Sequence, residues 1–164
     1  MTGNSEIQNR PQKVHRGEHI VSYTITVNAP AEELYAMASN PHRHQELDGS
    51  ETVRDTAVGP RELFEGDRFR VDMTKFGVHY ALTSVVTEAQ APHVIEWKHP
   101  AGHRWRWEFT PVAGDPSRTV VTESYDARGQ KPLVRRGLSV AKVPADNANG
   151  IKSSLQKLHD RYAG

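Results

Sequence analysis

The stretch that decides the fold runs from residue 27 to residue 50 and reads VNAPAEELYAMASNPHRHQELDGS. Pro30 suits an early helix position, because the N–H that proline lacks has no partner there in any case. Two glutamates in the first turn suit the positive N-terminal end of that helix. Asn40 and Pro41 then end it and open a second short helix over 42–47. The stretch therefore predicts two small helices in immediate succession.

A strand precedes these helices. In the run HIVSYTITV, at residues 19–27, β-branched and aromatic side chains dominate and apolar residues fall on alternate positions. Alternation of this kind predicts a strand with one buried face. The polar residues before it show no such pattern, so we expect a flexible leader over 1–17 and a single domain over 18–164.

From residue 50 onward the chain reads as successive strands separated by turn residues. Their short connections predict an antiparallel meander, because a parallel crossover needs a dozen or more residues. The expected strands are 50–58, 67–76, 78–90, 93–99, 103–112 and 117–128.

The chain closes on an amphipathic helix over 144–163, in which Ile151, Leu155, Leu158 and Tyr162 share one face. Residues 129–144 are expected to be irregular apart from a short helical turn. With the first strand, the sheet has seven strands. One curved antiparallel sheet around the terminal helix is the α+β arrangement that buries all of these apolar faces together.

Composition excludes several classes of protein. The chain has 164 residues, no cysteine, and 21 Lys and Arg against 20 Asp and Glu. Without cysteine there are no disulfides, thiolate metal sites or cysteine nucleophiles. The balanced charge argues against nucleic acid as a partner. No run approaches the ~18 apolar residues of a membrane-spanning helix, so we expect a cytoplasmic protein without stable membrane insertion, either a monomer or a weak homodimer.

This order of elements resembles the polyketide cyclase/dehydrase-like branch of the SRPBCC superfamily, related in fold to START lipid-transfer domains and the birch pollen allergen. The likeness is carried by the strand that runs into an Ala-Pro helix start, by the Trp-rich strand HRWRWEFTPV at 103–112, and by the C-terminal helix. The resemblance implies a helix-grip fold, in which a curved seven-stranded antiparallel sheet holds the long C-terminal helix in its concave face. It also implies an apolar cavity for a small hydrophobic ligand such as a lipid or polyketide. We expect no cofactor.

The candidate ligand-binding residues are apolar and aromatic side chains expected on one inner face. Trp105 and Trp107 alternate with arginines, so the two indoles share a face of their strand. Such a wall suits a flat apolar ligand, although the same aromatic residues could instead form core beneath the helix. The predicted cavity-lining residues are Val71, Met73, Trp97, Trp105, Trp107, Tyr125, Leu155 and Leu158.

Three residues are candidates for acid–base chemistry, namely His79, His99 and Glu123. A histidine near a carboxylate in an apolar pocket has the shifted pKa that a polyketide cyclase or dehydratase would need. The strand register of 117–128 leaves open whether Glu123 faces the interior or solvent. An enzyme therefore stands as the alternative to a binding protein.

Three further features are expected to be structural. His42 and His44 form an HxH pattern, but a spacing of two does not bring side chains together, and we expect both on a surface helix or turn. With cysteine also absent, no metal site is predicted. The run 48–50, Asp-Gly-Ser, reads as a turn or as the entrance to a cavity. The acid-free basic stretch 128–142 leaves a third alternative, an interaction module without a ligand.

Overall fold

The computed structural model describes residues 9–50 and 52–163 of the chain. Its sheet has eight strands in the order β1-β2-β8-β7-β6-β5-β4-β3. The strands are β1 (Gln12–Val14), β2 (Ile20–Val27), β3 (Val53–Val58), β4 (Arg68–Lys75), β5 (Val78–Gln90), β6 (Val94–Lys98), β7 (Arg104–Val112) and β8 (Asp115–Asp126). The helices are α2 (Ala31–Ala38), η1 (Pro41–Arg43), α3 (His44–Leu47), α4 (Pro132–Val140) and α5 (Val143–Arg161).

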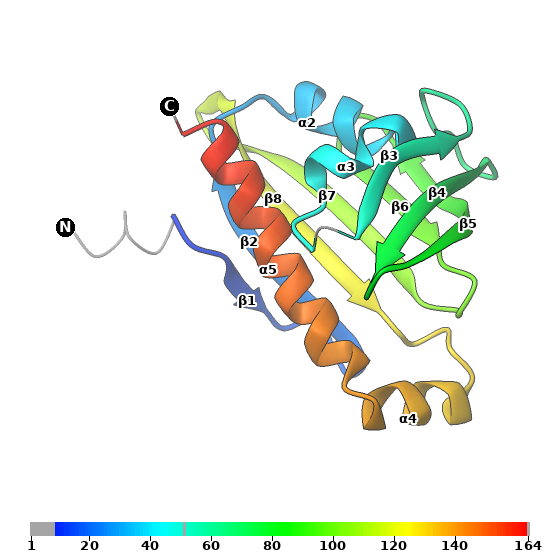
Figure 1. The fold of residues 1–164 in the computed structure, drawn as a ribbon. Coiled ribbons are helices and arrows are strands. Elements are labelled where there is room, and N and C mark those ends of the chain that lie inside the picture. Colours follow the sequence, from blue (N-terminus) through cyan, green and yellow to red (C-terminus); the bar gives the residue numbers. More distant parts are fainter. Residues whose placement is uncertain (1–8, 51, 164) are drawn as a thin grey trace.

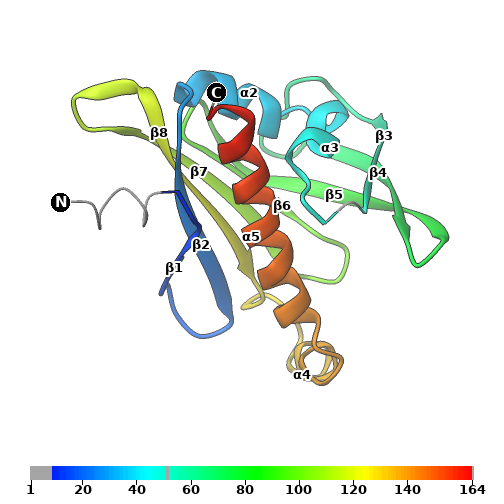
Figure 2. The same cartoon turned by 60° about the vertical axis from the view of Figure 1, so that its left-hand side comes forward.

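The predicted helix-grip arrangement is confirmed. Neighbouring strands pair antiparallel, and α5 lies across one face of the sheet, where it packs on β2 and β8 (Figure 1). The short elements α2, η1 and α3 carry the chain from β2 to β3 at the far side of the sheet. They lie near the C-terminal end of α5, whereas α4 lies at its N-terminal end (Figure 2). Helices therefore bound the inner face of the sheet at both ends of α5.

Part of the predicted leader belongs to the sheet. Gln12–Val14 forms β1 and pairs with Ser22–Thr24 of β2. Arg16 reaches further, and its guanidinium lies 2.5 Å from the carboxylate of Glu108 on β7. The sheet thus has eight strands and not seven, and the prediction of a flexible leader fails at these residues, because backbone pairing to a sheet edge needs no apolar pattern in the added segment. Residues 1–8 of the predicted leader lie outside the described residues.

The two faces of β7 differ as its alternation predicted. Trp105 and Trp107 turn toward α5, whereas Arg106 lies on the opposite face. There its guanidinium contacts the carboxylates of Glu88 at 2.5 Å and Glu96 at 3.1 Å. This ion-pair network keeps the outer face of the central strands polar and leaves the aromatic residues to the inner face.

The helices at the end of the chain follow the predicted order with one extension. α5 has 19 residues, and the inner positions Ile151, Leu155 and Leu158 are fully buried. The stretch expected to hold only a helical turn forms the nine-residue helix α4. Within the described ranges, no helix is both long and apolar enough to cross a membrane.

Candidate functional site

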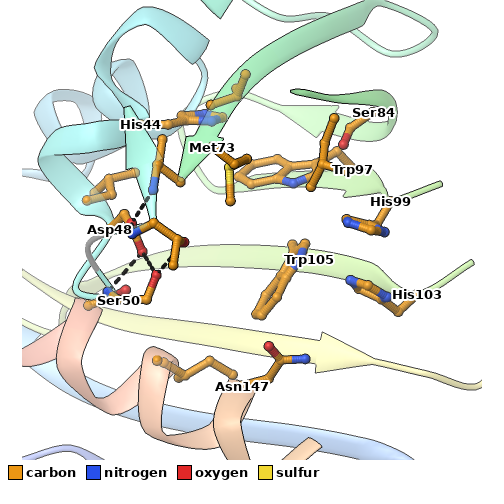
Figure 3. A pocket seen from close by; sticks show the side chains of 18 of the residues that line it. His44, Asp48, Ser50, Met73, Ser84, Trp97, His99, His103, Trp105 and Asn147 are labelled. Atoms are coloured by element: carbon orange, nitrogen blue, oxygen red, sulfur yellow. Dashed lines mark hydrogen bonds between the residues drawn. The ribbon is translucent and has the colours of Figure 1, made fainter. Parts of the chain in front are cut away.

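A cavity of about 390 Å³ lies between the inner face of the sheet and α5. Strands β3 to β8 form its floor, and α3, α4 and the N-terminal half of α5 form its walls. Figure 3 shows the indoles of Trp97 and Trp105 between two polar groups of residues. Asp48 and Ser50 lie on one side, and the two histidines of the β6–β7 turn lie on the other.

Most of the predicted ligand residues border this cavity, and three do not. Those that line it are Val71, Met73, Trp97, Trp105 and Trp107. Leu155 and Leu158 belong to the core, because the cavity borders α5 along Asn147, Ile151 and Ser154 and does not reach the two leucines, which are fully buried. Tyr125 is fully buried behind Trp105, with 5.4 Å between the ring centroids.

The histidine of α3 packs as an aromatic residue. His44 stacks on Trp97 with 4.8 Å between centroids, and its Nε2 donates to the carbonyl of Ala38 at 2.8 Å. Burial lowers the pKa of His44 to about 4, so the ring is neutral at neutral pH. The prediction of a surface position is wrong for His44, because α3 folds over the sheet and turns this side chain into the cavity wall. His42 is half-buried, and its Nε2 donates to the carbonyl of Gly59.

A histidine pair forms the opposite wall. The rings of His99 and His103 are stacked with 4.2 Å between centroids. The Gln130 amide donates to His103 Nδ1 at 3.3 Å, and the backbone N–H of Ala101 donates to His99 Nδ1 at 2.9 Å. Burial lowers the pKa of both rings, that of His103 to about 3. The pair therefore presents neutral rings to the cavity.

His79, the other histidine considered for acid–base chemistry, lies outside the cavity. The even-numbered residues Tyr80 and Leu82 of β5 line the cavity. Because side chains alternate along a strand, the odd-numbered His79 lies on the opposite face. There it is exposed, and its Nδ1 lies 2.9 Å from the hydroxyl of Thr74. The interpretation of His79 as a pocket residue is wrong, because β5 places odd-numbered residues outward here.

Glu123, like His99, is an acid–base candidate that lines the cavity. On β8 it pairs with Trp107 of β7, and its side chain turns inward and is buried. Its Oε2 atom has no hydrogen-bond partner among the described residues. Burial raises the pKa of Glu123 well above its usual value, and the carboxylate of Asp48 raises it further. The register left open by the sequence thus places a buried carboxyl group at the cavity floor, where burial favours its neutral form.

The loop after α3 is both a turn and a border of the cavity. The Asp48 carboxylate accepts four hydrogen bonds, from the backbone N–H groups of Ser50, Thr52 and Val53 and from the Ser50 hydroxyl, at 2.5–3.0 Å. Gly49 lies directly against α5, and its N–H donates to the Ser154 hydroxyl at 3.0 Å. The loop therefore fixes one end of the cavity against the helix.

The basic stretch 128–142 and the residue that follows it contribute apolar side chains to the cavity. Leu138 of α4 and Val143 of α5 line it, although Leu133 and Val140 on the same short stretch are largely exposed. Arg135 is half-buried, and its guanidinium donates to the carbonyl of Gln130 at 3.4 Å.

Sequence reasoning missed several lining residues that the structure brings together. Among them are His44, His103, Ser84 and Asn147. Only His103 had a sequence signal, because it faces His99 across a tight turn. In the described part of the chain, no three His, Asp or Glu side chains are grouped as metal ligands.

The family model for polyketide cyclase / dehydrase and lipid transport matches residues 18–163. The chain belongs to this family. The resemblance drawn from the sequence is thereby confirmed, and the polyketide cyclase/dehydrase and lipid transport family supports a module that binds hydrophobic ligands.

Relatives of this family member are found among curated proteins and solved structures. The uncharacterized protein Rv0088 of Mycobacterium tuberculosis is 42% identical over 153 residues, which cover 92% of this chain and 67% of the relative. Protein Ms6760 from Mycobacterium smegmatis is similar in structure, with a TM-score of 0.63, 16% identity, and coverage of 93% and 96% of the two chains. The Polyketide_cyc-like protein Cgl2372 from Corynebacterium glutamicum has a TM-score of 0.58, 17% identity, and coverage of 88% and 91%. At such identities the structural likenesses show the fold alone.

Proposed function

We propose that the protein binds a small hydrophobic molecule, preferably an aromatic one, in the cavity between the sheet and α5. The carrying observation is that Trp97 and Trp105 are only half-buried although they lie on the inner face of the sheet. Trp107 also borders the cavity but is fully buried, and Phe109, farther along β7, belongs to the core. Large indoles that border an unfilled space offer flat apolar contact area to a ligand. The volume also lies in the range of about 300–1,000 Å³ that is typical of ligand pockets.

The same cavity favours ligand binding over an interaction module with a filled core. Its lining combines aromatic and aliphatic side chains with polar groups on two sides and Glu123 on the floor, which suits orientation of a ligand with an apolar body. The histidine pair supports this view, since neutral imidazoles pack against apolar rings without a charge to desolvate.

One observation favours a second candidate function, catalysis of cyclisation or dehydration. Glu123 combines burial in an apolar cavity with a raised pKa, which is the state that a general acid at neutral pH requires. An enzyme of this kind would convert a molecule retained by the protein, with a pH–rate profile that Glu123→Gln abolishes.

The test of the proposed function combines native mass spectrometry of the purified protein with titration of the neutral fluorescent probe N-phenyl-1-naphthylamine. We expect either a retained small molecule or saturable probe binding. Trp105→Ala should weaken probe binding roughly tenfold or more, because it removes a large contact surface. Phe76→Ala is the matched control, since Phe76 is 94% exposed and lies outside the cavity lining.

Two results would contradict this function. The first is the absence of both a retained mass and saturable binding by the folded protein. The second is unchanged probe affinity in a folded Met73→Trp variant, whose added indole volume should fill the cavity.

A further inference from the structure

Glu123 lies between Val121 and Tyr125 in the inner row of β8. Its inner neighbours, Val121 and Tyr125, are fully buried parts of the core. Glu123 itself is 6% exposed, and it forms no hydrogen bond or ion pair with any of the residues that the structure describes. A buried polar group without a partner is costly and rare in native proteins, so its presence calls for an explanation.

The position of Glu123 offers that explanation. Its side chain lies in the cavity lining beside Trp107 on the sheet and opposite Ile151 and Ser154 on α5. The charged group near it is Asp48, whose carboxylate is already occupied by four donors of its own loop. The carboxyl of Glu123 is therefore available to a molecule in the cavity and not to its protein surroundings.

We infer that the ligand carries a neutral oxygen function, a carbonyl or a hydroxyl, that pairs with the carboxyl of Glu123 inside the cavity. This inference rests on the proposed function and narrows its ligand class from hydrophobic molecules in general to ketones, phenols, alcohols or esters with an apolar body. A pure hydrocarbon would leave the carboxyl unpaired.

The chemistry of the group selects a neutral partner. Burial at an apolar position favours the protonated form of Glu123, which offers one O–H donor and retains acceptor capacity. This form can donate to a carbonyl or exchange hydrogen bonds with a hydroxyl. An anionic ligand would lie near the Asp48 carboxylate, which disfavours it. An ammonium ligand would pair best with an ionised Glu123. Ionising Glu123 would place a second carboxylate charge near Asp48 in this apolar site, which is costly.

A matched series of two-ring probes tests the inference by isothermal titration calorimetry. The series is 2-acetylnaphthalene, 2-naphthol, 2-ethylnaphthalene and 2-(aminomethyl)naphthalene. We expect the ketone and the phenol to bind roughly tenfold more tightly than the ethyl compound, because one buried hydrogen bond distinguishes them. The amine should not exceed the ethyl compound.

Two variants at position 123 separate hydrogen bonding from packing. Glu123→Gln keeps a donor and an acceptor, so the preference for the ketone should survive within a few-fold. Glu123→Leu removes both, so all four probes should bind with similar affinity. Because Glu123→Leu removes an unpaired buried polar group, the variant should fold, and circular dichroism confirms this before titration.

Failure of the role of Glu123 and failure of ligand binding give different results in this experiment. If all probes bind equally to the unmodified protein, the cavity binds ligands but the role of Glu123 is overturned. A clear preference for the amine, lost in Glu123→Gln, would overturn it in favour of cation binding. If no probe and no apolar dye binds, the proposed function itself fails.

Discussion

The imidazole rings of His99 and His103 lie face to face across the turn between β6 and β7, with 4.2 Å between their centroids and 19° between their planes. His103 also packs against Tyr125 at 4.7 Å and edge-on against Trp105 at 5.7 Å. Protonating either ring would bring a positive charge into this aromatic cluster. Burial therefore favours the neutral form of both rings, and protonation would destabilise the stack.

This relationship predicts acid sensitivity. The pKa of His103 falls from 6.5 to about 3, first because of burial and then because of His99. The unfolded chain thus binds more protons below pH 6.5, and stability decreases as the pH falls from 6.5 toward 3. For this group alone the loss is about 1.4 kcal/mol per pH unit. Urea unfolding between pH 4.5 and 7 should show a shallower pH dependence in His103→Gln, and parallel curves would contradict the prediction.

Glu123 predicts the opposite dependence. Its pKa in the folded protein lies well above the usual 4.5, so the folded state retains a proton that the unfolded chain releases. Stability from this group is complete below pH 4.5 and is lost as the pH rises through the folded-state pKa, at about 1.4 kcal/mol per unit. The difference in free energy of unfolding between Glu123→Gln and the unmodified protein should therefore shift in favour of the variant when the pH is raised from 5 to 8. An equal difference at both pH values in urea unfolding would count against it.

The contact between Gly49 and α5 predicts a sharp size limit. A Cβ at Gly49 would lie 2.3 Å from the backbone carbonyl carbon of Ser153, so the loop or the helix would have to move. Gly49→Ala should cost about 2–3 kcal/mol of unfolding free energy. Gly137→Ala in α4 is the matched control, because no heavy atom lies within 4 Å of its added Cβ. That control should stabilise the protein by about 0.5–1 kcal/mol in thermal or chemical unfolding, and similar effects in both variants would contradict the proposed packing.

Core and cavity residues should respond differently to truncation. Leu155 is fully buried beneath α5, so Leu155→Ala should cost about 2–5 kcal/mol. Met73 is half-buried and borders the existing cavity, so Met73→Ala should cost less than about 1.5 kcal/mol and should alter probe affinity. Guanidinium unfolding and probe titration of both variants measure the contrast. Equal destabilisation would mean that Met73 is packed as core.

Local patterns predicted most of the fold, because they concern a single element each. The alternation of Trp105 and Trp107 with arginines assigned the two faces of β7, and the spacing of Ile151 and Leu155 assigned the inner face of α5. β1 escaped prediction because Gln12–Val14 pairs through its backbone and carries no apolar alternation of its own.

The site was harder to predict than the fold. A cavity forms where the inner face of the sheet and α5 do not pack against each other, and this depends on how the two elements are placed in three dimensions. Leu155 and Ile151 share one helical face, yet only Ile151 reaches the cavity. His44 had no signal, since its burial depends on how α3 folds over the sheet. The orientation of Glu123 depended on a register that the apolar and polar residues of 117–128 supported equally well.

The three residues of β1 affect whether another chain can pair with the edge of the sheet. Without β1, the outer edge of β2 would offer free N–H and C=O groups along Ile20–Val27, which are a template for strand addition by another chain. The short β1 occupies the positions opposite Ser22–Thr24 and places Lys13 at its centre. A brief edge strand with a charged residue is poorly suited to intermolecular pairing, so β1 makes the middle of this sheet edge a weaker template for strand addition.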